Sequence, residues 1–156
     1  MSAIQKRLDE LGITIPTVAP PVAAYVPAII SGNLVFTAGQ LPFVAGALAY
    51  KGKVGDGDEL VSPTIAKALA QTCILNALAA AENVIGSLDR VTRVVKVTGF
   101  VASDPSFSGQ PGVINGASEL LVDLFGDRGI HARSAVDVAV LPLDAPVEIE
   151  VILEFA

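Results

Sequence analysis

One arginine and three nearby glutamates are the residues in this sequence best suited to chemistry. Arg133 lies at the start of an apolar run, and a second apolar run over 147–155 carries Glu148, Glu150 and Glu154 at alternate positions. An arginine side chain stays protonated at ordinary pH and offers a planar fork of donors that matches a carboxylate. The sequence therefore predicts a small anion-binding site on the surface of a sheet.

His131 is the only histidine and lies two residues before Arg133. A neutral imidazole can move a proton near neutral pH, but a lone histidine at the entrance of a strand is more often an ordinary polar loop residue. Cys73 has apolar neighbours and is expected in the core. One histidine and one cysteine cannot form a structural zinc site, and no calcium loop, phosphate loop or dinucleotide motif occurs.

Length and composition favour one folded domain over residues 1–156. Hydrophobic residues make up 52% of the chain and charged residues 17%, a balance that argues against disorder. The mean hydropathy of +0.61 is high for a monomer, yet no apolar run reaches the roughly 18 residues of a membrane span. We therefore expect apolar surface to be buried between subunits and expect no membrane partner.

The chain is acidic, with a net charge of −6 and a pI of about 4.6. Such a surface repels phosphate backbones, so nucleic acid is a disfavoured partner. The first ten residues lack the apolar core of a signal peptide, and a single cysteine excludes an internal disulfide. These features fit a reducing cytoplasm.

Local patterns predict which elements position the candidate residues. Helices are expected over 3–11, over 63–85 with Ser62 as N-cap and Gly86 as C-cap, and over 112–125. Residues 13–30 are expected to form an extended, irregular arm, followed by a strand over 34–38 and a loop over 40–60 with a short strand near 47–50. Further strands are predicted over 90–101, 132–141 and 147–155.

This order predicts an α+β fold with the helices on one face of the sheet. If the last two strands form a hairpin that pairs like with like, Arg133, Asp137 and the glutamates share one surface. The other interpretation of that surface is a cross-strand ion pair on a solvated face, which contributes little stability. Asn115 could simply stabilise the start of its helix, and Tyr25 could cover the edge of the core.

Several segments together resemble the RidA family, also called the YjgF or reactive-intermediate deaminase family. They occur in the family's order: Tyr25, 32–42 (GNLVFTAGQLP), 53–55, Arg133-Ser134, Leu141-Pro142 and 147–150. Longer segments resemble a divergent branch often labelled putative endoribonuclease: 86–91, 95–101 and 115–121.

The resemblance implies a chorismate-mutase-like fold with ferredoxin-like β-α-β layers, a mixed sheet, and a homotrimer with clefts between subunits. It implies hydrolysis of 2-imino or enamine acids to 2-oxo acids and ammonia without a metal or organic cofactor. Arg133 matches the family's carboxylate clamp and Glu148 the residue that holds or polarises water. Tyr25 and Asn115 match further pocket residues, and His131 lies where better-studied members usually lack histidine.

Two departures from the family pattern leave other functions open. Ala38 replaces a pocket serine and Ala135 a typical pocket cysteine. The trimer could therefore bind a small carboxylate or other metabolite without turnover. A third hypothesis is RNA cleavage with His131 as base and Arg133 as phosphate clamp, against which the acidity and the single histidine argue.

Overall fold

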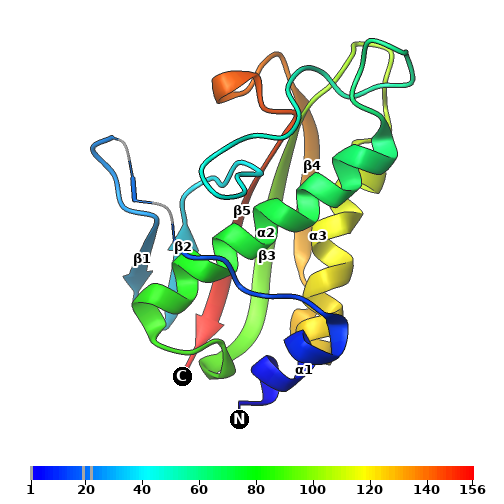
Figure 1. Ribbon diagram of the computed structural model, residues 1–156. Coiled ribbons are helices and arrows are strands. Elements are labelled where there is room, and N and C mark those ends of the chain that lie inside the picture. Colours follow the sequence, from blue (N-terminus) through cyan, green and yellow to red (C-terminus); the bar gives the residue numbers. More distant parts are fainter. Residues whose placement is uncertain (1, 19, 22) are drawn as a thin grey trace.

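The computed structural model describes residues 2–18, 20–21 and 23–156, and places helices on one face of a five-stranded sheet (Figure 1). The helices are α1 (Ala3–Leu11), α2 (Pro63–Ile85) and α3 (Gln110–Phe125), with 3-10 turns η1 (Leu88–Arg90), η2 (Gly126–Gly129) and η3 (Pro142–Asp144). The strands are β1 (Ala28–Ser31), β2 (Leu34–Thr37), β3 (Val91–Ala102), β4 (Ala132–Val138) and β5 (Val147–Phe155).

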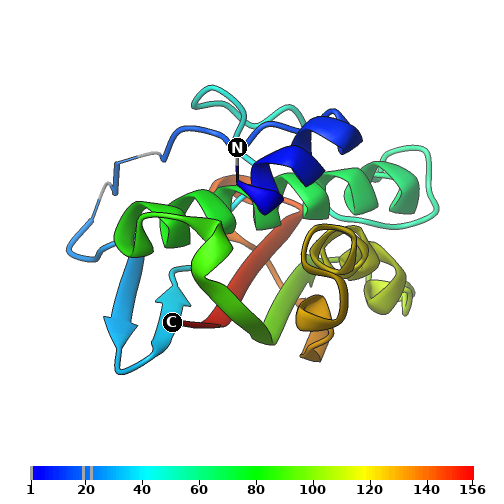
Figure 2. The same ribbon diagram turned by 90° about the horizontal axis from the view of Figure 1, so that it is seen from below.

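The sheet is mixed, as predicted. Its strand order is β1-β2-β5-β3-β4. β3 and β4 pair in parallel, whereas the other neighbours are antiparallel. A parallel pair needs a crossover connection, and α3 supplies it between β3 and β4. Figure 2 shows the three helices above the sheet and its other face without a covering layer.

The ends of the helices follow the capping residues in the sequence. The Ser62 hydroxyl accepts a hydrogen bond from the Ile65 amide at 3.2 Å, and Pro63 occupies the first turn of α2. Gly86 ends that helix with a φ of 87°, a conformation that suits glycine because it has no Cβ. Gly12 ends α1 in the same left-handed region. The predicted bounds of α1 and α2 are confirmed.

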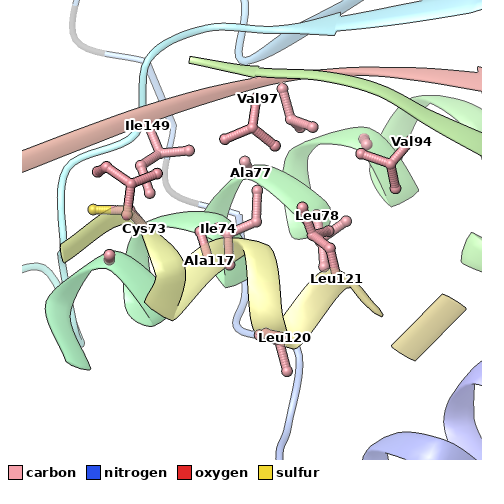
Figure 3. Close-up of a cluster of buried hydrophobic side chains, with 14 of the residues drawn as sticks. Cys73, Ile74, Ala77, Leu78, Val94, Val97, Ala117, Leu120, Leu121 and Ile149 are labelled. Carbon is pink, nitrogen blue, oxygen red and sulfur yellow. The ribbon is translucent and has the colours of Figure 1, made fainter. Parts of the chain in front are cut away.

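The core lies between the helices and one face of β3 and β5 (Figure 3). Alternate residues of β5, from Val147 to Leu153, are buried, and the strand packs against α2, as expected for a half-buried strand. Small residues let the two helices approach closely, because a Cβ on Gly116 would lie 2.0 Å from the Lys67 carbonyl oxygen. α2 is long and apolar enough to cross a membrane, but 56% of its most apolar window is buried in this domain.

The first strands differ from the prediction. The short strand predicted near 47–50 is absent, and the chain there forms an isolated bridge between Val44 and Ala47 around a tight turn. Ala45 and Gly46 both have positive φ in that turn. β1 lies instead at the end of the arm that was expected to be irregular, where it pairs with β2 across the Gly32 turn.

The predicted hairpin of the last two strands is wrong. β4 ends at Val138, three residues before the predicted end, and the chain crosses over through η3 before β5 begins. β3 lies between β4 and β5 and pairs with both. The long apolar strand β3 can bury both of its edges, and this satisfies more backbone hydrogen bonds than a peripheral position would.

Candidate functional site

Two neutral oxygens from α3 hold the guanidinium of Arg133. Its Nη1 donates to the Asn115 Oδ1 at 2.7 Å and to the Ser118 Oγ at 3.2 Å. Asn115 and Ser118 are three residues apart and share one face of the helix. Within the described residues, no carboxylate lies within ion-pairing distance of Arg133, since the two ion pairs there join Arg7 to Glu10 and Lys67 to Glu119.

The half-buried Arg133 side chain can therefore bind an external anion. Asn115 and Ser118 accept hydrogen bonds from Nη1, which leaves the Nε and Nη2 donors for a ligand. Asn115 lies in the second turn of α3, because the helix begins at Gln110 rather than near residue 112. Its side chain thus serves Arg133 and does not stabilise the first helical turn.

His131 also contacts Ser118. The His131 Nε2 lies 2.9 Å from the Ser118 Oγ, and the His131 Nδ1 lies 2.6 Å from the Gly129 carbonyl oxygen. His131 and Arg133 thus reach the same hydroxyl group from alternate positions of one segment. The structure brings together three of the predicted site residues, Arg133, Asn115 and His131.

Glu148 forms a separate half-buried group. Burial raises the pKa of its carboxyl above the ordinary value, and the neighbouring charge of Glu150 raises it further. The carboxylate lies against the backbone of Gly39, where an added Cβ would be 2.0 Å from the Glu148 Oε1. A half-buried carboxyl with a raised pKa can bind or exchange a proton closer to neutral pH than an ordinary glutamate.

The strand register places Arg133 and Glu148 on opposite faces of the sheet. Arg133 is paired with Val97, which is fully buried against the helices. Glu148 is paired with Phe100, whose side chain points to the other face because neighbouring residues of a strand alternate. The expectation that Arg133 and the glutamates share one surface is therefore wrong, and the inserted strand β3 is the reason.

Tyr25 is half-exposed and lies just before β1, whereas Arg133 is in β4. β1 and β4 are the two edges of the sheet, and four strand spacings of about 4.8 Å separate such edges by roughly 19 Å. One copy of the described chain thus brings neither Tyr25 nor Glu148 to Arg133.

Two other residues singled out in the sequence have structural roles. The Asp137 Oδ1 accepts hydrogen bonds from the Ser103 amide at 3.0 Å and hydroxyl at 2.6 Å, and these bonds lower the pKa of Asp137. Cys73 is fully buried in the core, where burial raises the pKa of its thiol. In the described part of the chain, no group of three or more His, Cys, Asp or Glu side chains could hold a metal ion.

Ser118 is the site residue that the sequence analysis missed. It occurs only as a small polar residue three positions after Asn115. A pair of polar residues on one helix face was the available signal, but the sequence does not say that this face meets β4. That contact depends on the parallel crossover, which brings α3 back across the sheet edge.

Comparison with known proteins gives a consistent set of relatives. Residues 5–155 match the family model described as YjgF/chorismate mutase-like, putative endoribonuclease. Protein TCP17 of Trypanosoma cruzi is 40% identical over 152 residues, which cover 97% of this chain and 93% of that protein.

Solved structures extend the comparison to the whole fold. The protein Atu1372 of Agrobacterium tumefaciens, of unknown function, aligns with a TM-score of 0.90 and 44% identity, covering 99% of this chain and 93% of that one. RidA from the Antarctic bacterium Psychrobacter aligns with a TM-score of 0.59 and 30% identity, covering 91% of this chain and 96% of that one. Both proteins thus share the fold of this domain, and the backbone of this chain aligns more closely with that of Atu1372.

Proposed function

This chain belongs to the YjgF/chorismate-mutase-like, putative endoribonuclease family, and from that premise we propose that it hydrolyses small 2-imino or enamine acids. The products are a 2-oxo acid and ammonia. Arg133 binds the carboxylate of the substrate through its guanidinium fork. Glu148 holds the attacking water, and no metal or organic cofactor takes part.

The observation that carries the proposal is the state of Arg133. Its guanidinium is half-buried, oriented by the Asn115 and Ser118 oxygens, and free of any carboxylate in the described part of the chain. Fixing a guanidinium in advance lowers the entropy cost of binding an anion. Imines hydrolyse readily in water, so a site that orients the acid beside a water molecule contributes much of what the reaction needs.

The proposal includes a site shared between copies of the chain. Arg133 and Glu148 lie on opposite faces, so a second copy must supply Glu148, and Tyr25 with it, to the Arg133 of the first. The sheet face without helices offers the contact, because Ile29 and Phe36 are paired side by side there and are 59% and 37% exposed. Val136 of β4, which is 44% exposed and paired with Phe100, lies on the same face. We propose a homotrimer, the assembly that the resemblance to RidA implies, as the one that shares the site.

Ammonia release tests the activity. An imino acid is generated in solution from its amino acid by an amino acid oxidase, and the rate of imine loss is followed with and without the protein. We expect Arg133→Ala to lose nearly all acceleration, whereas Arg7→Ala, which removes an exposed arginine on α1, keeps it. Turnover by Arg133→Ala at the wild-type rate would contradict the mechanism.

A second candidate function is binding of a small carboxylate without turnover. Ala38 and Ala135 carry no polar side chain, and Ala135 packs against the hydrophobic core. Calorimetric titration with pyruvate, run beside the ammonia assay, separates the two functions: binding without turnover favours the second. RNA cleavage has less support, because the chain has a net charge of −6 and a single histidine.

A further inference from the structure

We propose that Ser118 is a catalytic residue that the proposed hydrolysis uses for proton transfer, with His131 as the positioning residue that stores the proton. This inference rests on the proposed function and adds a proton route that lies within one copy of the chain. The route begins at Ser118 Oγ, the atom that both Arg133 and His131 contact.

The hydrogen bonds of His131 fix its tautomer. A carbonyl oxygen only accepts, so the bond of 2.6 Å to Gly129 requires the proton of the neutral ring to be on Nδ1. The Nε2 atom then carries a lone pair, and the contact of 2.9 Å with Ser118 is a hydrogen bond donated by the serine hydroxyl. A backbone carbonyl thus orients the imidazole, as a third group orients the base in nucleophile–base pairs.

Ser118 is polarised from two sides. Its hydroxyl donates to His131, and one of its lone pairs accepts from the Arg133 Nη1 at 3.2 Å. The second lone pair of this half-buried oxygen is the one hydrogen-bonding position of the hydroxyl that neither residue uses. While His131 is neutral, the free lone pair of Ser118 can therefore only accept a hydrogen bond, and with it a proton, from a water molecule beside Arg133. Once His131 is protonated, both lone pairs accept, and the hydroxyl can only donate outward.

These two states match the two steps of imine hydrolysis. In the first step, water forms a bond to C2 of the protonated imine, and the C=N electron pair moves to nitrogen. The water proton passes to Ser118 as the serine proton passes to the His131 Nε2. In the second step, the proton returns through Ser118 to the amino nitrogen. The C–N bond then breaks, C=O forms, and the hydroxyl proton leaves with ammonia as ammonium.

Other charged groups lie on the elements around His131. They are Arg133 in β4, Asp127 and Arg128 in η2, Arg93 and Lys96 in β3, and Asp123 and Glu119 in α3. The Glu119 carboxylate is paired with Lys67. Arg128 is bonded to the Val91 carbonyl oxygen. In the described residues, none of these side chains is hydrogen-bonded to the imidazole, so Ser118 and Gly129 are its partners.

The kinetic test compares His131→Gln, Ser118→Ala and Ser118→Thr with the wild type over a range of pH. Glutamine can keep the hydrogen bond to Ser118 but cannot store a proton. We expect His131→Gln and Ser118→Ala to lower kcat about 10²-fold with KM changed less than about threefold. We also expect His131→Gln to lose the fall in kcat/KM at acidic pH, because glutamine cannot store a proton, and we expect Ser118→Thr to recover activity.

The tautomer of the single histidine can be measured without any turnover. Nitrogen NMR of the imidazole needs no assignment, because each chain has one such ring. We expect the Nδ1-protonated tautomer in the neutral form, and the Nε2-protonated tautomer would overturn the inference. A second outcome is that the wild type hydrolyses the imine while His131→Gln keeps the wild-type kcat and the fall in kcat/KM at acidic pH. In that case the proton route fails and the proposed function stands. A wild-type protein without activity overturns both.

Discussion

The side chains of Arg133 and Glu148 project from opposite faces of the same sheet. Their partners on β3, Val97 and Phe100, are three residues apart. Residues an odd number of positions apart on a strand alternate between faces. A site that needs both side chains must therefore combine two copies of the chain.

Complementation between two inactive variants tests this relationship. Arg133→Ala and Glu148→Gln should each be inactive alone, since every site lacks one group. When the two are co-expressed and co-assembled in equal amounts, about one quarter of the sites should regain both groups if subunits mix at random. The ammonia assay on doubly tagged oligomers measures the recovery. No recovery in mixed oligomers would show that each chain builds its own site.

Replacing Asn115 tests how the guanidinium is held. The Asn115 Oδ1 accepts from Arg133 at 2.7 Å, so Asn115→Ala should leave the fold intact and raise KM about tenfold, as expected for losing one hydrogen bond to a charged group. Asn115→Asp should raise KM further, because its carboxylate would pair with Arg133 and compete with the substrate. Thermal unfolding of both variants checks the fold. An unchanged KM in both would mean that Arg133 does not bind the substrate.

The sequence predicted most elements because their signals are local. Ser62, Pro63 and Gly86 bound α2 through capping and backbone conformation, and α2 formed where they indicated. β1 was missed because it lies at the end of a proline-containing arm and is stabilised by pairing with β2. The strand predicted near 47–50 lacked such a partner, so its residues form a turn.

The register of the sheet could not be predicted, and the site depends on it. The short link between β4 and β5 suggested a hairpin, but the long strand β3 lies between them. That choice depends on contacts between residues far apart in the sequence, which no local pattern encodes. Arg133 was singled out by its chemistry and Asn115 by the resemblance to RidA, while Ser118 was found only when the structure placed α3 over β4.

Gly39 provides a test of Glu148 that leaves the carboxylate chemically intact. An added Cβ would lie 2.0 Å from the Glu148 Oε1, and the end of the flexible glutamate side chain can move away. Gly39→Ala should therefore cost less than about 1 kcal/mol in unfolding free energy but lower kcat tenfold or more by displacing the carboxylate. Gly112→Ala is the control, since its Cβ meets no atom within 4 Å. Full activity in Gly39→Ala would show that the position of Glu148 is unimportant.

The raised pKa of Glu148 predicts a pH-dependent effect on stability. Burial, and then the charge of Glu150, raises the folded-state pKa above the ordinary value, so the folded protein binds this proton more tightly than the unfolded chain does. The free energy of unfolding therefore falls as pH rises from the ordinary carboxyl value to the folded pKa. Glu148→Gln removes this cost and should be more stable than the wild type at pH 7.

The advantage of Glu148→Gln should shrink toward zero below about pH 4, where the wild-type carboxyl is protonated in both states. Urea unfolding followed by circular dichroism at pH 7 and pH 4 measures the difference. Glu150→Gln is the matched control: it removes only the second cause of the raised pKa, so its gain at pH 7 should be smaller. A Glu148→Gln protein less stable than the wild type at pH 7 would mean that the carboxylate makes a favourable contact in the assembled protein, and that burial does not dominate its energetics.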